Sequence, residues 1–200
     1  MGLDIQYDEG QTPLDEDEKE ELRIPNITTR GELDELEQRN IEDAVRWTIT
    51  RHRRFTVTEV LTEEFVRSVH TRMLGDVWNW AGSFRNSNKN IGVDKYQISI
   101  ELRQLLDDCR YWIEHETFLP DEIAVRFKHR IVSIHCFANG NGRHSRLMAD
   151  ILIEKVLRGN VFTWGAKNFV NTGEYRAAYL HALREADKGK FELLTQFARS

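Results

Sequence analysis

The sequence predicts an all-α fold, a helical bundle with one small β-hairpin. Its apolar residues recur mostly at the spacing of three and four residues that places them on one face of a helix. No Pro-rich or Gly/Ser-rich linker divides the 200 residues, which are enough for a sizeable core. Trp78–Arg85 and Ile91–Ile98 are instead two short runs of aromatic and branched residues around an asparagine-rich centre, as in a hairpin or an irregular flap over about residues 82–98.

Seven segments have helical apolar spacing, and each is expected to form a helix. In chain order they are Leu33–Ile49, Leu61–Leu74, Ile98–Ile113, Ile123–Ile134, Arg143–Leu157, Tyr175–Leu183 and the short Phe191–Phe197. Thr29 with Glu32 forms a capping box that starts the first helix. Pro120, followed by Asp121 and Glu122, is a favourable start for the fourth.

The chain is expected to hold one domain over residues 29–200, preceded by an acidic amino-terminal arm over residues 1–28. Cys109 and Cys136 form no motif and have apolar neighbours, which indicates free buried thiols. The histidines outside residue 135 show no metal-ligand spacing, and His144 is expected to point to solvent or to cap the rim of a site.

The composition excludes some classes of function. Lysine and arginine number 28 against 33 aspartates and glutamates, and the net charge of −5 argues against a general nucleic-acid surface. No apolar run approaches the roughly 20 residues needed to cross a bilayer, and the amino terminus lacks a basic start with an apolar core. We therefore expect a cytoplasmic protein that binds neither nucleic acid nor a membrane directly.

The run HCFANGNGRHSR, residues 135–146, predicts a phosphate-binding loop between two buried helices. Gly140 and Gly142 can take positive φ angles and carry no Cβ, so backbone N–H groups can approach an oxyanion closely. The helix that follows adds the positive end of its dipole.

Three side chains complete this loop. Arg143 and Arg146 lie three residues apart on one helix face, so both guanidinium groups can reach one polyphosphate. His135 is the side chain of the run whose pKa suits proton transfer near neutral pH. The sequence therefore places a candidate base beside a candidate nucleotide site.

This run resembles the signature of Fic-domain enzymes, His-x-Phe-x-(Asp/Glu)-Gly-Asn-Gly-Arg-x-x-Arg. The positions that match it are His135, Phe137, Gly140, Asn141, Gly142, Arg143 and Arg146. Asn139 departs from it, because it stands where the family has an acidic residue. A longer resemblance, from TPLD near Pro13 through ITTRGELDELEQRNI to the signature, is to the Fic branch called mobile mystery protein B.

The resemblance implies a Fic-type helical bundle that transfers AMP from ATP, with Mg²⁺, to a Ser, Thr or Tyr hydroxyl of a target protein. His135 would be the general base, and Phe137 would anchor the loop in the core. Asn139 would be a weak magnesium ligand, because an amide oxygen carries no charge. The residues that would bind the nucleotide are Asn139, Gly140, Asn141, Gly142, Arg143 and Arg146.

The stretch of about residues 82–98 resembles the Fic flap, which pairs with an extended segment of the target by strand addition. The residues that would dock the target are Arg85, Lys89, Ile91 and Gly92. Arg85 and Lys89 could contact phosphate as well as the target, and solvated loop charges are the alternative for both.

Glu37 and Asn40 lie within an otherwise apolar face of the first long helix, where an unpaired carboxylate would be costly. We expect a buried arginine to pair with Glu37. Many Fic proteins have an inhibitory glutamate that pairs with the second arginine of the signature, and this resemblance implies a Glu37–Arg146 pair. The local motif matches poorly, since Leu33 stands four residues before Glu37, so a structural glutamate stays open.

Three functions remain open from the sequence. AMP transfer is favoured by Gly142, because this glycine leaves room for a diphosphate. Phosphate transfer by a Doc-like variant, with the nucleotide reversed, is disfavoured by the same residue. A catalytically weak nucleotide-binding module is kept open by Asn139, and it would act through a partner. The branch resemblance implies that this partner is a small helix-turn-helix protein in a toxin-like pair.

Overall fold

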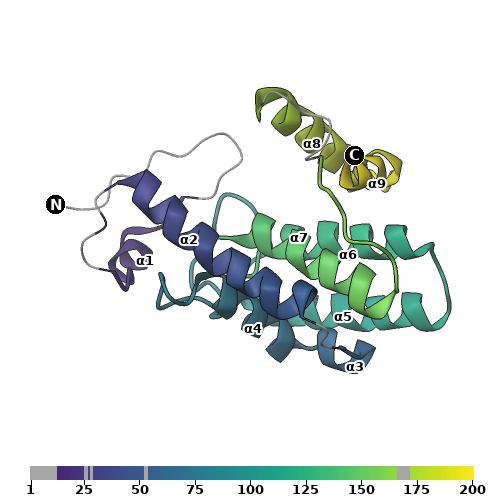
Figure 1. Cartoon of the computed structure of the whole chain (residues 1–200), viewed down its shortest axis with the longest axis horizontal. Coiled ribbons are helices and arrows are strands. Elements are labelled where there is room, and N and C mark those ends of the chain that lie inside the picture. The colour runs from purple at the N-terminus through teal and green to yellow at the C-terminus, as the bar shows by residue number, and fades with distance from the viewer. Residues whose placement is uncertain (1–12, 25–26, 28, 52–53, 166–171) are drawn as a thin grey trace.

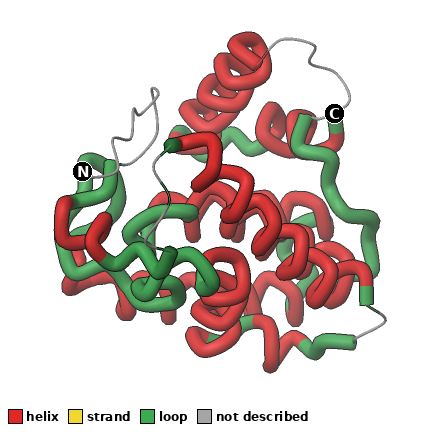
Figure 2. The backbone as a smooth tube through the Cα atoms, turned by 60° about the vertical axis from the view of Figure 1, so that its left-hand side comes forward, coloured by secondary structure: helices red, strands yellow, loops and turns green. Residues whose placement is uncertain are grey.

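The computed structural model describes residues 13–24, 27, 29–51, 54–165 and 172–200. Within these residues the fold is helical, and β-pairing is limited to one isolated bridge between Leu22 and Trp78 (Figure 2). The all-α prediction is therefore confirmed. The α-helices are α1 Glu16–Glu20, α2 Arg30–Val45, α3 Val57–Val60, α4 Glu63–Leu74, α5 Ile98–Glu114, α6 Pro120–Ile134, α7 Asn141–Ile151, α8 Thr172–Asp187 and α9 Glu192–Arg199.

The helices α4, α5, α6 and α7 form a bundle, and α2 lies across one side of it (Figure 1). Helix α6 packs against both α5 and α7, and α2 packs against α4. Helices α8 and α9 pack against each other, and α9 contacts α6. The bundle encloses the large buried side chains Trp78, Phe127, Phe137 and Met148.

The helix starts follow the signals in the sequence. Pro120 is the first residue of α6, where its missing N–H is not needed, as predicted. The capping box of α2 also forms, since the Glu32 amide donates to Thr29 Oγ1 at 3.3 Å and the Thr29 amide donates to the Glu32 carboxylate at 3.1 Å. Helices α2 and α7 each continue into a π-helical turn, Arg46–Thr50 and Leu152–Val156.

The predicted β-hairpin over residues 82–98 does not form; the chain there is an irregular loop that ends in the 3₁₀ turn Lys95–Gln97. The reason is that the Arg85 guanidinium lies inside this loop and donates to the Ser87 and Val93 carbonyls. A side chain therefore bonds carbonyls that a ladder between two strands would use. We call residues 82–97 the flap.

Part of the predicted acidic arm packs on the bundle, while residues 1–12, 25–26 and 28 lie outside the described residues. The amides of Arg23 and Asn79 donate to the Val77 and Glu21 carbonyls at 2.8 and 3.0 Å, so two chain segments are joined backbone to backbone. Leu14 is buried as well. We call residues 13–24 the acidic strap.

The described helices include none that is both long and apolar enough to span a membrane. Cys109 and Cys136 are free and buried, as predicted. Burial raises the pKa of each thiol to about 12, so both stay protonated at neutral pH and are inert.

Helix α6 carries a lysine in the core. Lys128 has no exposed surface, and its amine donates to the Tyr179 hydroxyl of α8. Burial holds the pKa of Lys128 well below its ordinary value of 10.5, and the charge of Arg146 adds to the shift. Because the unfolded chain binds this proton more tightly, the free energy of unfolding rises as the pH increases toward 10.5.

We predict that Lys128→Met raises the free energy of unfolding at pH 7 by roughly 1–3 kcal/mol, because methionine fills the space without a desolvated amine. Urea unfolding at pH 7 and pH 9 measures this. The gain should shrink at the higher pH. A loss of stability at both pH values would mean that the bond to Tyr179 outweighs the desolvation of Lys128.

Candidate active site

The site is built at the turn between α6 and α7. Helix α6 ends at Ile134, and His135 follows in the left-handed conformation with φ 57° and ψ 62°. Because this conformation costs a residue with a Cβ about 1–2 kcal/mol, the surrounding contacts must hold it. Gly140, with φ 77°, then turns the chain into α7, as its lack of a Cβ permits.

A fully buried phenylalanine anchors the turn. Phe137 stacks on the His70 ring of α4 at 3.7 Å between centroids. His70 also bonds both ends of the site: Nδ1 accepts the Gly82 amide at 2.9 Å, so Nε2 carries the proton and donates to the Asn139 carbonyl at 3.0 Å. Spacing in the sequence gave no signal for His70, because its partners lie elsewhere in the chain.

His144 lies behind the same turn and is buried, so the prediction that it points to solvent or caps the rim was wrong. Helix α7 packs between other helices, and position 144 faces α4, where Nε2 lies 3.0 Å from the Val66 carbonyl. Its ring meets Phe137 edge to face at 5.1 Å. Burial lowers the pKa of His144 to about 4, and burial also holds the pKa of His70 well below 6.5.

The Asn141 side chain closes the turn. Its Oδ1 accepts the Phe137 amide at 3.0 Å, and its Nδ2 donates to the Phe137 carbonyl at 2.8 Å. Both polar ends of the amide are thus used within the turn, so the side chain shapes the loop. A phosphate here would be bound by backbone N–H groups.

The amino terminus of α7 can accept an anion. Gly140 cannot cap it with a side chain, and the first turn contains no acidic residue. A Cβ added to Gly142 would meet nothing within 4 Å, so space adjoins the backbone there. A positive φ is expected from the sequence for both Gly140 and Gly142. Gly140 has one, whereas Gly142 is helical. Unbonded amides, the helix dipole and this space suit a phosphate.

His135 has the protonation state of a base at neutral pH. Its side chain is buried, and burial, with the nearby charges of Arg85 and Lys89, lowers its pKa to about 4. The imidazole is therefore neutral near pH 7 and can accept a proton. The flap covers it: a Cβ added to Gly92 would lie 2.7 Å from the His135 Cβ.

The predicted flap residues divide into two kinds. Arg85 is buried, and its Nε donates to the His135 carbonyl at 2.7 Å, so it holds the flap against the turn. The Lys89 side chain is 3% exposed and is ion-paired. Ile91, in contrast, is 46% exposed, and Gly92 has a φ of 104°.

Glu37 is buried and has an arginine partner, as the sequence predicted, but the partner is the partly exposed Arg143 and not Arg146. The Glu37 carboxylate is 2.6 Å from Arg143 Nη1 and accepts the Trp78 indole N–H at 2.7 Å. Arg143 lies in the first turn of α7, within reach of α2, whereas Arg146 Nε donates to the Gly142 carbonyl at 3.3 Å and its guanidinium lies 6.0 Å from the Tyr179 ring centroid.

The described residues show no cluster of the side chains that most often bind metals. They hold no group of three or more His, Cys, Asp or Glu side chains that could bind a metal. Asn139 Oδ1 lies 2.5 Å from the Gly140 amide nitrogen and accepts its hydrogen. A hard cation at this turn would need further oxygen ligands, of the kind that phosphates provide.

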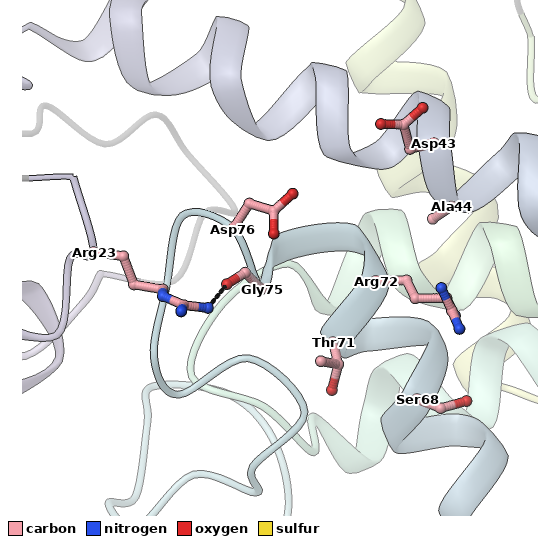
Figure 3. Close-up of a pocket in the computed structure, with 8 residues that line it drawn as sticks. All are labelled: Arg23, Asp43, Ala44, Ser68, Thr71, Arg72, Gly75 and Asp76. Carbon is pink, nitrogen blue, oxygen red and sulfur yellow. Dashed lines mark hydrogen bonds between the residues drawn. The ribbon is translucent and has the colours of Figure 1, made fainter.

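A hollow of about 500 Å³ opens away from this turn, between α2 and α4 (Figure 3). The side chains and backbone that line it belong to Arg23, Asp43, Ala44, Ser68, Thr71, Arg72, Gly75 and Asp76. Its cations already have partners: Arg23 donates to the Gly75 carbonyl, and Arg72 lies 3.9 Å from the Trp47 ring centroid. Because it adjoins neither His135 nor the start of α7, we place the candidate site at the turn.

Residues 60–153 match the model of the Fic/DOC family. The chain is 27% identical over 141 residues to protein adenylyltransferase Fic of Drosophila virilis and 26% identical to that of Drosophila melanogaster. These alignments cover 68% of this chain and 27% of each relative. The chain thus spans about a quarter of the length of these curated relatives.

Solved structures share the fold at low identity. BepC of Bartonella tribocorum, solved with bound AMPPNP, superposes with a TM-score of 0.67 at 16% identity and covers 92% of this chain and 97% of its own. Fic-1 of C. elegans gives 0.63 at 20%, covering 88% and 50%. A Fic domain of Bartonella quintana with bound ADP gives 0.65 at 15%, covering 88% and 86%.

We predict that the free energy of unfolding falls as the pH drops from 6.5 to 4. In this range the histidines bind protons in the unfolded chain but stay neutral where they are buried in the folded chain. His144 alone accounts for up to roughly 3 kcal/mol, from a pKa of about 4 against 6.5. In His144→Asn the decline, measured by urea unfolding across this range, should be shallower by a similar amount. An unchanged slope would place the His144 pKa near its ordinary value.

Proposed function

We propose that this chain, whose residues 60–153 match the Fic/DOC family model, transfers AMP from ATP to a Ser, Thr or Tyr hydroxyl of a target protein. One observation carries the proposal: a neutral imidazole, His135, stands at the same turn as the uncapped start of α7. A group able to accept a proton and backbone amides able to bind phosphate, both at one turn, support the proposal.

In the proposed reaction, His135 takes the proton of the target hydroxyl as its oxygen attacks the α-phosphorus. The new oxygen–phosphorus bond forms as the bond to the bridging oxygen breaks, and pyrophosphate leaves. The backbone N–H groups at the start of α7 and the Arg143 guanidinium hold the phosphates and stabilise their charge. The nucleotide-binding set remains Asn139, Gly140, Asn141, Gly142, Arg143 and Arg146.

The space beside Gly142 favours AMP transfer over phosphate transfer. AMP transfer requires the β- and γ-phosphates to lie deep at the start of α7, and a Cβ at this position would point into open space. A catalytically weak nucleotide-binding module is the second candidate, because Asn139 stands where the signature has an acidic residue. In the proposal, ATP supplies most of the oxygen ligands to Mg²⁺, and Asn139 adds a weak one.

We extend the proposal to regulation. While Glu37 binds Arg143, one of the cations that would bind phosphate is engaged, so the enzyme is partly inhibited. A structural role for Glu37 is the alternative, since the same carboxylate joins α2 to α7 and to Trp78. We further propose that the chain belongs to the mobile mystery protein B branch and is located in the cytoplasm. Its proposed partner is a small helix-turn-helix protein.

Radiolabelled ATP separates the candidate functions. Label from the α-phosphate on the protein or on a target supports AMP transfer, and label from the γ-phosphate supports phosphate transfer. Nucleotide binding measured by calorimetry without either label supports the binding module. Because each outcome selects one function, this experiment decides among them.

We predict that His135→Ala slows AMP transfer by about 10²–10⁴-fold, because the base is removed, while ATP affinity stays nearly unchanged. Filter-binding of labelled protein and calorimetry measure the two quantities. His115→Ala, an exposed histidine at the end of α5, is the control and should retain the full rate. A parallel loss of ATP affinity in His135→Ala would instead assign His135 to nucleotide binding.

A second prediction tests the glutamate. Glu37→Gln should raise labelling severalfold by releasing Arg143, whereas Arg143→Ala should not, because it also removes a phosphate ligand worth roughly 1.5–3 kcal/mol. Glu35→Gln, an exposed glutamate of the same helix, is the matched control. Unchanged labelling with a lower melting temperature in Glu37→Gln would make Glu37 a structural residue.

A further inference from the structure

The acidic strap is bound to the flap by charge. Lys89 Nζ lies 2.6 Å from the Glu18 carboxylate and 2.8 Å from the Asp15 carboxylate. The Lys89 side chain is 3% exposed, so the strap encloses this cation almost completely. Ser87 contributes a second contact, because its hydroxyl donates to Asp15 Oδ2 at 2.6 Å.

Other contacts set the strap in one position. The Trp80 indole N–H donates to the Glu18 carbonyl at 3.1 Å, and Asp15 caps the start of α1. The hydrogen bonds from Lys89 and Ser87 lower the pKa of Asp15, so this carboxyl is charged at neutral pH. Asp15 and Glu18, three residues apart, thus present two carboxylates on the side that faces the flap.

The flap that the strap covers also covers His135. The Arg85 amide donates to the Cys136 carbonyl at 3.0 Å, and the Val93 amide donates to the Ile134 carbonyl at 3.3 Å. The flap is thereby bonded to the residues on both sides of His135. A segment that binds at Ser87 and Lys89 consequently lies next to the candidate base.

The bond between strap and flap can be exchanged. The Asp15 side chain is 51% exposed, so its ion pair with Lys89 is in contact with water and is screened by salt, whereas the Glu18 side chain is 9% exposed. Because the strap is what encloses Lys89, its departure would expose an unpaired cation on the flap. Another segment with two carboxylates at the same spacing could then pair with it.

We propose that Ser87 and Lys89 form a docking site for an acidic segment of the target protein, and that Asp15 and Glu18 fill this site in cis until a target displaces them. The naming of the occupant as a target rests on the proposed function. The site itself rests on the contacts of Lys89. The target is then recognised by two carboxylates three residues apart, close to the hydroxyl that is modified.

Peptide binding tests this site without AMP transfer. The probe is a fluorescein-labelled peptide of residues 13–20, PLDEDEKE, titrated with the full chain and followed by anisotropy. Asp15→Asn/Glu18→Gln should bind it at least tenfold more tightly than the wild type does, because its own strap no longer competes. The control, Asp17→Asn/Glu20→Gln, removes two negative charges from the same strap and should behave as the wild type does.

Two further arms identify the receptor. Adding Lys89→Gln to the Asp15→Asn/Glu18→Gln chain should abolish binding, Lys89→Arg should preserve it, and added salt should weaken it. A peptide with Asn and Gln at positions 15 and 18 should bind at least tenfold more weakly. Equal affinity of all chains for the peptide, or binding that survives Lys89→Gln, overturns the proposal.

Hydrogen exchange of the flap guards against a folding defect. Asparagine caps a helix as well as aspartate does, so Asp15→Asn/Glu18→Gln should keep its circular dichroism while flap amides exchange faster. If that variant unfolds, the same hydrogen-exchange measurement is made on Lys89→Gln with the natural strap, which removes the cation of the pair and keeps the carboxylates. Protected flap amides in a folded Lys89→Gln would overturn the proposal. Peptide binding without any AMP transfer would refute the proposed function alone.

Discussion

The candidate site depends on one neutral imidazole, the His70 ring of α4. Its two nitrogens bond the Gly82 amide and the Asn139 carbonyl, and its face supports Phe137. The start of the flap, the signature turn and α4 are therefore fixed to one another through a single side chain. A protonated ring could not accept the Gly82 amide, so burial, which keeps the ring neutral, also keeps the site assembled.

Much of the fold could be predicted from the sequence because its signals are local. Helical spacing, the capping box of Thr29 and the start at Pro120 involve neighbours in the chain, and the structure confirms them. The candidate site could be located for the same reason, since His135 and the start of α7 share one short run. The partners of Glu37 and Lys89 lie 106 and 71 residues away. The packing of α2 brings Glu37 to Arg143, and the packing of the strap brings Glu18 and Asp15 to Lys89. Residue spacing in the sequence does not indicate these pairings.

Several acidic side chains of the amino-terminal part of the chain are paired with cations of the candidate site. Glu37 of α2 is bonded to Arg143 on the nucleotide side of the turn, and the strap carboxylates are bonded to Lys89 on the flap side. Both bonds link the amino-terminal part of the chain to cations of the candidate site. Arg143, which would bind a nucleotide, and Lys89, which would bind a target, are thus each paired with a carboxylate of the same molecule.

The left-handed backbone at His135 sets chemistry against stability at one position. Glycine or asparagine would adopt φ 57° with less strain, yet neither could serve as a base. Selection for stability alone would favour those residues here. In a chain of this fold, Gly or Asn at this turn would therefore indicate that the scaffold is kept without the proposed base.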